Sequence, residues 1–167
     1  MKNFVDELEK VIFRNGNRTL TFGIEHILKS IQMMKFEKYV SRASLCQKLC
    51  LGEGSVKTII LHLKKAEYVD SIKSGTYLLD KGHCMIDEIS KYIVTEIPVK
   101  QTKFLPSYFN HAVILKNISN DIVDGMQQRD FAIVAGANTA LTITVKENKF
   151  WIPMGRDSIV VDDPYIK

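Results

Sequence analysis

Side chains suited to binding phosphate and base edges are concentrated in residues 54–66, which read GSVKTIILHLKKA. At about 100° per residue, four apolar residues fall on one third of a helix and predict its buried stripe: Val56, Ile59, Ile60 and Leu63. The residues expected to point away are Lys57, Thr58, Leu61, His62 and Lys65, with Ser55 near the helix start. Ammonium, hydroxyl and imidazole groups on one helix face can bind phosphates or base edges.

The segments on either side of this helix add to the same chemistry. Ser41 is a good N-cap for a short preceding helix, and Arg42 follows it directly. Glycines at 52 and 54 allow another molecule to approach the backbone closely. Downstream, Lys73-Ser74-Gly75 interrupts two short extended runs and predicts a β-hairpin turn. We therefore expect Lys73 and Ser74 to reach the same ligand.

Composition places the chain among cytoplasmic globular proteins. The 167 residues are 46% hydrophobic and 25% charged, and no apolar run approaches the roughly 18–20 residues of a membrane span. Three cysteines without an export signal indicate a reduced compartment and no disulfide framework. The net charge is +4, but residues 29–82 hold ten Lys and Arg against five Asp and Glu, which gives +5. Basic charge is thus concentrated around the predicted helix.

Two prolines, at 98 and 106, bracket VKQTKFL and suggest a boundary between domains at 1–97 and 98–167. The first domain is predicted to hold helices and the hairpin, then a helix from Asp80 whose inner face extends to Ile93. The second is predicted as a small α/β domain with strands at HAVILKN, ALTITV and KFWIP and a helix over NDIVDGMQQRDFAIVAG. The whole chain is predicted to be α+β.

Three helices followed by a hairpin resemble a winged helix-turn-helix domain. The resemblance rests on Leu45, Cys46, Leu49 and Leu51, then Ser55-Val56, Ile60, Leu63 and Tyr68-Val69, with Cys46 at the small-residue position between two helices. It implies that the helix at 54–66 enters the DNA major groove while the hairpin acts as a wing. In the related motif Thr is usual where Leu79 stands, which leaves Asp80 to cap the next helix.

More narrowly, LGEGSVKTI and GMQQRDFAIVAGANTA resemble an uncharacterised archaeal family of winged-helix proteins with a short carboxy-terminal α/β domain. The resemblance spans about residues 20 to 152. It implies a fold and supplies no function for the second domain.

The second domain offers a separate polar group on its predicted helix and the segment after it. Its members are Gln128, Arg129, Asp130 and Asn138, with Gln127 beside them. Adjacent Arg and Asp residues on a helix do not face each other, so each is expected to need its own partner. A small ligand, a dimer partner and plain surface polarity all remain open as explanations.

Three other readings of the sequence remain beside DNA binding. The exposed Leu61 and the scarcity of arginine also suit a protein-docking face. Cys46 and Cys50, with His83-Cys84, could supply metal ligands, although buried small hydrophobic side chains are the default explanation. The Asp162-Asp163 pair reads as a solvated tail, and no recognised catalytic or cofactor motif accompanies it.

We therefore expect a cytoplasmic transcriptional regulator that binds duplex DNA through Arg42, Ser55, Lys57, Thr58, His62, Lys65, Lys73 and Ser74. A homodimer is expected, because two half-sites roughly double the contact energy of one domain. The second domain would serve dimerisation or response to a small-molecule effector. No enzyme activity, cofactor, metal or membrane partner is expected; an enzyme of the second domain is the remaining alternative.

Overall fold

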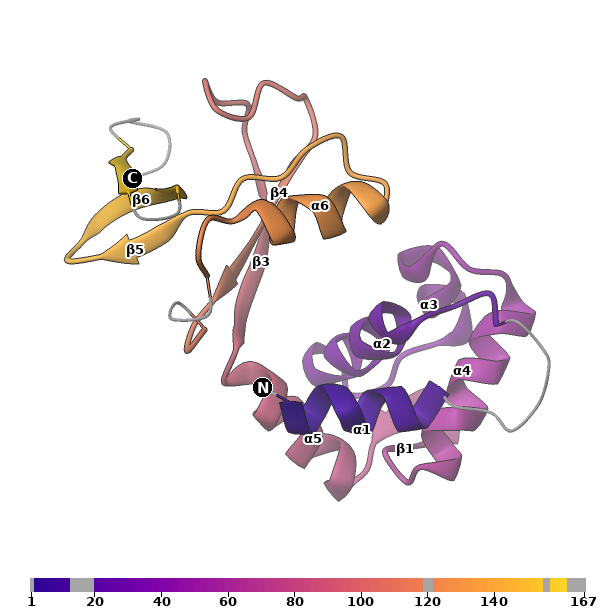
Figure 1. Cartoon of the computed structure of the whole chain (residues 1–167). Helices are drawn as coiled ribbons and strands as arrows, with labels where there is room; N and C mark the ends of the chain where they lie inside the picture. Colours follow the sequence, from indigo (N-terminus) through magenta and orange to yellow (C-terminus); the bar gives the residue numbers. More distant parts are fainter. Residues whose placement is uncertain (1, 13–19, 119–121, 155–156, 162–167) are drawn as a thin grey trace. The chain divides into compact units, whose positions relative to one another are not determined.

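A computed structural model describes residues 2–12, 20–118, 122–154 and 157–161 of the chain. It is a mixed α+β protein that divides into an N-terminal unit, Met1–Ser90, and a C-terminal unit, Lys91–Lys167 (Figure 1). The expected boundary at residues 97 and 98 is therefore seven residues too late. The strand that begins at Ile93 pairs with a strand of the C-terminal unit and belongs with it.

Five helices and one hairpin make up the N-terminal unit. In chain order they are α1 (Lys2–Ile12), α2 (Ile24–Phe36), α3 (Arg42–Leu49), α4 (Glu53–Lys65), β1 (Val69–Ile72), β2 (Gly75–Leu78) and α5 (Asp80–Ser90). The expected N-cap of α3 is confirmed, because the Ser41 hydroxyl accepts a hydrogen bond of 3.1 Å from the Ser44 amide. No helix among the described residues is long and apolar enough to cross a membrane.

The core of the N-terminal unit forms from the apolar stripes of its helices. Fully buried side chains come from α1, α2, α3, α4, α5 and β1, and include Leu8, Ile27, Leu45, Ile59, Leu63, Val69 and Ile89. The stripe predicted for α4 is confirmed, since its four apolar members are all buried. Burial of such side chains contributes about 1.5–3 kcal/mol each, so this unit contains a substantial core of its own.

The hairpin predicted around Lys73-Ser74-Gly75 is present and is held to the helices. Strands β1 and β2 pair antiparallel. Val40, which lies outside both strands, forms an isolated β-bridge with Thr76 of β2 through two hydrogen bonds of 2.9 Å. Gly75 has a φ of +141°, and a Cβ there would lie 2.8 Å from the Val40 carbonyl oxygen. Only glycine fits this close approach, which fixes the hairpin against the start of α3.

The α1 helix packs against α4 and α2, and Val11 in its last turn contacts His62 of α4. The Val11 carbonyl oxygen lies 2.8 Å from Nδ1 of His62, and the Phe22 ring meets the imidazole edge-on at 6.0 Å. His62 is buried, with 6% of its surface exposed. The prediction that His62 points outward is therefore wrong, because α1 covers the side of α4 next to the apolar stripe.

Strands dominate the C-terminal unit. Its elements are β3 (Ile93–Val99), β4 (Asn110–Leu115), α6 (Met126–Val134), β5 (Thr144–Lys146), β6 (Lys149–Met154) and β7 (Asp157–Val160). They form two small antiparallel sheets, β3-β4 and β5-β6-β7. The strands predicted at HAVILKN and KFWIP are confirmed in position, whereas the one predicted at ALTITV overlaps β5 only at Thr144 and Val145, and α6 is shorter than expected. Ile93 begins β3 and does not extend α5, which ends at Ser90.

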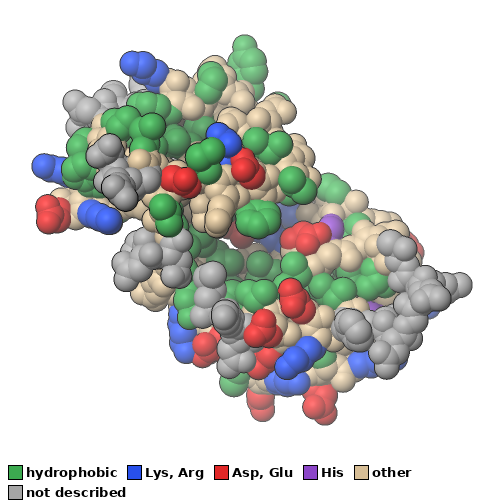
Figure 2. Space-filling view, viewed as in Figure 1, with side chains coloured by type: hydrophobic (Ala, Val, Ile, Leu, Met, Phe, Trp, Pro, Cys, Tyr) green, Lys and Arg blue, Asp and Glu red, His purple; other side chains and the backbone are tan. Residues whose placement is uncertain are grey.

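Few side chains of the C-terminal unit are buried. Among the described residues, only Thr102, Pro153 and Val161 are buried side chains, and α6 has none. Large apolar side chains are exposed on every part of the unit, and Figure 2 shows hydrophobic side chains at its surface at many points. The expected burial of β4 is wrong, because Val113, Ile114 and Leu115 are each nearly half exposed. The indole N–H of Trp151 is buried without an acceptor among the described residues.

Candidate nucleic-acid interface

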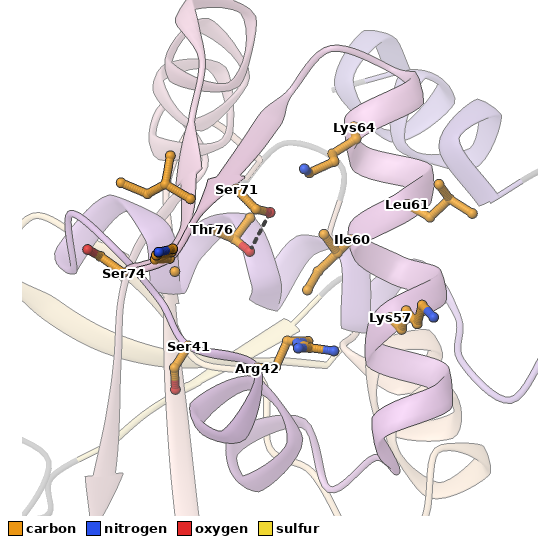
Figure 3. Close-up of a pocket in the computed structure, with 12 residues that line it drawn as sticks. Ser41, Arg42, Lys57, Ile60, Leu61, Lys64, Ser71, Ser74 and Thr76 are labelled. Carbon is orange, nitrogen blue, oxygen red and sulfur yellow. Dashed lines mark hydrogen bonds between the residues drawn. The ribbon is translucent and has the colours of Figure 1, made fainter.

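A cleft of about 670 Å³ opens on the N-terminal unit between three elements. The beginning of α3, the outer side of α4 and the β1-β2 hairpin form its walls (Figure 3). Its lining residues are Ser41, Arg42, Lys57, Ile60, Leu61, Lys64, Ser71, Ile72, Lys73, Ser74, Gly75 and Thr76. The cleft thus joins the helix expected to read DNA with the turn expected to act as a wing.

Four of the lining residues are cations and none is an acid. Arg42, Lys57 and Lys73 are exposed and form no ion pair with any described residue. They come from α3, α4 and the hairpin turn, so the positive charge surrounds the cleft. Three unpaired cations at one opening attract a polyanion, since each can neutralise one phosphate.

The fourth cation, Lys64, is held by an internal partner. Its Nζ lies 2.9 Å from Oδ1 of Asp70 at the start of the hairpin. This hydrogen bond, and then the Ser71 amide, hold the pKa of the Asp70 carboxyl below its usual value. Both partners are substantially exposed, so the pair contributes little to stability. Its effect is to fix α4 to the base of the hairpin, and Figure 3 shows Lys64 directed towards it.

Hydroxyl groups line the opposite side of the cleft. The Ser71 and Thr76 hydroxyls are 3.1 Å apart across the hairpin. Thr76 is buried, so the half-buried Ser71 hydroxyl is the one of the pair that a ligand can reach. Ser74 is exposed at the turn. Small hydroxyl side chains next to unpaired cations are frequent in contacts to sugar and phosphate.

The structure places Ser55 and Thr58 outside the cleft lining, in hydrogen bonds to other residues of the N-terminal unit. Ser55 Oγ lies 2.6 Å from Thr21 Oγ1, and Thr58 Oγ1 donates to the Gly54 carbonyl at 2.9 Å. Both side chains are half-buried. Each hydroxyl can still accept a hydrogen bond, so contact with a ligand by these two residues stays a prediction.

Sequence reasoning chose Lys65 for this face, but Lys64 is the lysine that lines the cleft. Lys57, Leu61 and Lys64 are spaced i, i+4 and i+7 and therefore share one face of α4. Lys65 is exposed about 100° further around the helix and does not line the cleft. The i+7 relation to Lys57 is the sequence signal that would have identified Lys64.

Three apolar side chains also line the cleft: Ile60, which is buried, and the exposed Leu61 and Ile72. Leu61 is 43% exposed on α4, and Ile72 is 50% exposed at the end of β1. Both line the same cleft as the cations. An aliphatic group here can contact a thymine methyl group or an apolar side chain of a protein partner.

The cysteines do not form a joint site. Cys46 is half-buried, Cys50 and Cys84 are exposed, and all three are free. Among the described residues, no group of three His, Cys, Asp or Glu side chains is placed to hold a metal ion. The Asp162-Asp163 pair lies outside the described residues.

The polar group of the C-terminal unit is not gathered into one cluster. Gln128, Asp130 and Asn138 are exposed, and Arg129 is half-buried. Arg129 Nη2 donates to Asp130 Oδ1 at 2.9 Å, so the expectation that these neighbours need different partners is wrong. The flexible stem of the Arg129 side chain lets its planar guanidinium reach the adjacent carboxylate, and Arg129 Nε also donates to Asp130 Oδ1, at 3.1 Å. Among the described residues, no further hydrogen bond joins two of these four residues.

Comparison with known proteins gives two matches, one to the last 62 residues of the chain and one to most of it. Residues 106–167 match a family model described as a domain of unknown function, DUF4443, which covers β4 to β7. Of the solved structures, hypothetical protein PH0730 from Pyrococcus horikoshii OT3 superimposes with a TM-score of 0.66 and 26% sequence identity. The match covers 79% of this chain and 66% of that one. The chain resembles an uncharacterised archaeal protein.

The expected archaeal resemblance is thus supported, and neither description names an activity. No curated protein matches the chain. The family model begins inside the segment between β3 and β4, so it omits the strand that pairs with β4 in this structure.

Proposed function

We propose that this chain is a winged helix-turn-helix regulator that binds duplex DNA, as a homodimer, through the cleft between α3, α4 and the β1-β2 hairpin. The observation that carries the proposal is the set of three unpaired cations around that cleft, Arg42, Lys57 and Lys73. They sit on the three elements that contact DNA in winged-helix proteins.

The arrangement of the N-terminal unit supports the winged-helix assignment. Helices α3 and α4 are separated by a short turn, with Cys50 in the left-handed region at a φ of 53°. The β1-β2 hairpin follows α4 directly, and Val40 pairs with β2 through an isolated β-bridge to Thr76. This order of helix, turn, helix and hairpin leaves the outer side of α4 available to the major groove and the hairpin turn to the adjacent backbone.

Electrostatics favours a nucleic acid over a neutral ligand. A duplex carries one phosphate charge per about 1.7 Å of its axis, and each phosphate neutralised by a cation releases condensed counterions. The cleft supplies the cations without an acidic lining residue. Two of the three unpaired cations are lysines, which cannot make the bidentate guanine contact of an arginine. Binding is therefore predicted to depend more on phosphates than on bidentate guanine contacts.

A docking function is the second candidate, and one observation favours it. Leu61 and Ile72 are exposed within the cleft, where they would make an apolar floor for a peptide side chain. Leu61→Glu separates the two functions. Loss of capture of a protein partner with retained DNA binding supports docking, whereas weakened DNA binding supports groove entry by α4.

Two lysines of the same helix provide the test of the proposal. Lys57→Ala removes an exposed cation of the cleft, and Lys65→Ala removes another exposed cation of the same helix outside it. Fluorescence anisotropy with duplex DNA at several salt concentrations should show weaker binding for Lys57→Ala and a salt slope reduced by about 0.9. Lys65→Ala should change both quantities less. Equal effects of the two substitutions, or no binding at low salt, would reject the cleft as the DNA site.

The role of the C-terminal unit in effector response stays part of the proposal. Gln128, Asp130 and Asn138 are exposed and Arg129 is half-buried, so a small ligand could reach all four. Binding of a metabolite to the folded state would raise the melting temperature in proportion to its saturation. A thermal-shift screen against a metabolite panel therefore tests this role, and Asp130→Ala should remove any shift that the pair mediates.

A further inference from the structure

The C-terminal unit carries large apolar side chains that its described residues do not cover. We use the name C-terminal apolar surface for the five most exposed of them, which lie on α6 and in the segments just before β4 and α6 and range from 71% to 96% exposed: Tyr108, Phe109, Val123, Phe131 and Val134. Isolated exposed apolar residues are common on proteins, but three nearly bare aromatics in one small unit are not.

The helix α6 gives the strongest sign that a partner is missing. It has nine residues and buries none of them, yet short helices in proteins owe most of their stability to packing. Phe131 and Val134 are three residues apart and so lie within about 60° on one side of the helix. The half-buried Ala132 and Arg129 lie on another side. One side of α6 thus faces its own unit while the side with Phe131 has no cover.

The β3-β4 hairpin shows the same deficiency. It pairs with no third strand among the described residues, and a two-stranded sheet is marginal in water without a covering layer. Ile97 and Ile114 remain 43% and 46% exposed on it. A unit that leaves both its helix and its sheet uncovered resembles half of a shared hydrophobic core.

We infer that a second copy of this chain covers the C-terminal apolar surface, so that two C-terminal units complete one core about a two-fold axis with α6 at its centre. The inference deepens the proposed dimeric function and rests on it for the need to present two N-terminal units to two half-sites.

The available area fits a homodimer. A buried aromatic side chain contributes about 150–250 Å², so three aromatics at these exposures offer about 400–640 Å² from one copy. Val123 and Val134 bring the total towards the roughly 800 Å² per partner of a standard interface. A small-molecule ligand would cover much less, which favours a macromolecular occupant.

Measurement of the mass in solution tests the inference on the full chain. Multi-angle light scattering after size exclusion should give about twice 19.1 kDa, that is 38.2 kDa, at concentrations of tens of micromolar. Phe131→Asp should raise the dimer dissociation constant at least about tenfold and give mass near 19.1 kDa. Phe36→Asp is the matched control, because Phe36 is 83% exposed on the N-terminal unit and should leave the dimer intact.

Hydrogen exchange keeps the test decisive if Phe131→Asp misfolds. In the wild-type chain, the amides of α6 should exchange more slowly as the concentration rises through the dissociation constant, while those of α4 should not change. A monomer at all concentrations, or a dimer that Phe131→Asp and Tyr108→Asp both leave unchanged, would overturn the inference. A dimer that fails to bind DNA would retain this interface and reject only the proposed function.

Discussion

The two units of this chain differ in what they do with their apolar residues. The N-terminal unit places the apolar residues of α4 at its centre, with Val56, Ile59 and Leu63 at 0% exposure. The C-terminal unit has a similar supply of large apolar residues but leaves most of them accessible, including every side chain of α6. The comparison teaches that one unit is organised around its own core and presents charge outward, while the other presents apolar surface.

Substitution of one leucine in each unit should give the largest effect on the free energy of unfolding and tests this difference in burial. Leu63 is fully buried in α4, and Leu115 is 46% exposed at the end of β4. Leu63→Ala should lower the free energy of unfolding by about 2–5 kcal/mol, because it removes buried methyl groups and leaves a cavity. Leu115→Ala should cost well under half as much. Urea denaturation followed by circular dichroism measures both, and equal losses would contradict the difference between the units.

Removal of two cations should break the function of one unit without affecting the other. The double variant Arg42→Ala, Lys57→Ala should weaken duplex binding about tenfold at moderate salt, because two phosphate contacts are lost. Both side chains are exposed, so the melting temperature should change little. Anisotropy gives the affinity, and light scattering should show an unchanged oligomeric state. A loss of the oligomer in this variant would mean that the two units are not independent in function.

The N-cap of α3 gives a smaller effect confined to the N-terminal unit. Ser41→Ala removes the acceptor of the Ser44 amide and should cost about 1 kcal/mol of stability. Ser41→Asn, which retains a capping oxygen, should restore most of the loss. Thermal denaturation of the three proteins provides the check, and a neutral Ser41→Ala would show that water caps this helix equally well.

Replacement of thymine by uracil should give a similar or smaller effect and tests Leu61. An aliphatic side chain that covers a thymine methyl gains about 0.8 kcal/mol, or roughly fourfold in affinity. A duplex with uracil in place of thymine should therefore bind more weakly to the wild-type chain, and Leu61→Ala should abolish the difference. Equal affinity of the wild type for the two duplexes would assign Leu61 to another role.

Alkaline pH probes the contact between α1 and the rest of the N-terminal unit. Burial, and then the hydrogen bond of 3.1 Å to the Glu7 carboxylate, raise the pKa of Tyr68 to about 12. The folded state therefore favours the neutral phenol, and its contribution to stability is complete below about pH 10 and is lost as the pH rises towards 12. Tyr68→Phe should flatten the decline of stability in this window, as measured by urea denaturation at each pH.

Features encoded in neighbouring residues were predictable from the sequence. The Ser41 cap, the apolar stripe of α4 and the hairpin turn near Gly75 each follow from a pattern of a few residues, and the structure contains all three. Features that depend on distant residues were not. His62 is enclosed by Val11, which is 51 positions away in the chain, and no local pattern reveals that α1 covers it.

The errors in the C-terminal unit have a related cause. Ile93 follows Ile89 at helical spacing, so periodicity alone extends the helix past Ser90, whereas pairing with Leu115 makes Ile93 the first residue of β3. The apolar strand at Asn110–Leu115 predicts burial, but the described part of the unit does not cover it. Within the site, the cations were predictable by type, while the choice of Lys64 over Lys65 required the position of the hairpin.

The salt dependence of duplex binding by the wild-type chain tests the central claim most directly. If Arg42, Lys57, Lys73 and, in part, Lys64 each meet a phosphate, the logarithm of the association constant should fall with the logarithm of salt concentration with a slope of about −2.7 to −3.6 per N-terminal unit. Measurable binding at low salt with that slope is the predicted result. The absence of binding at low salt, or a slope near zero, would contradict the assignment of the cleft to DNA.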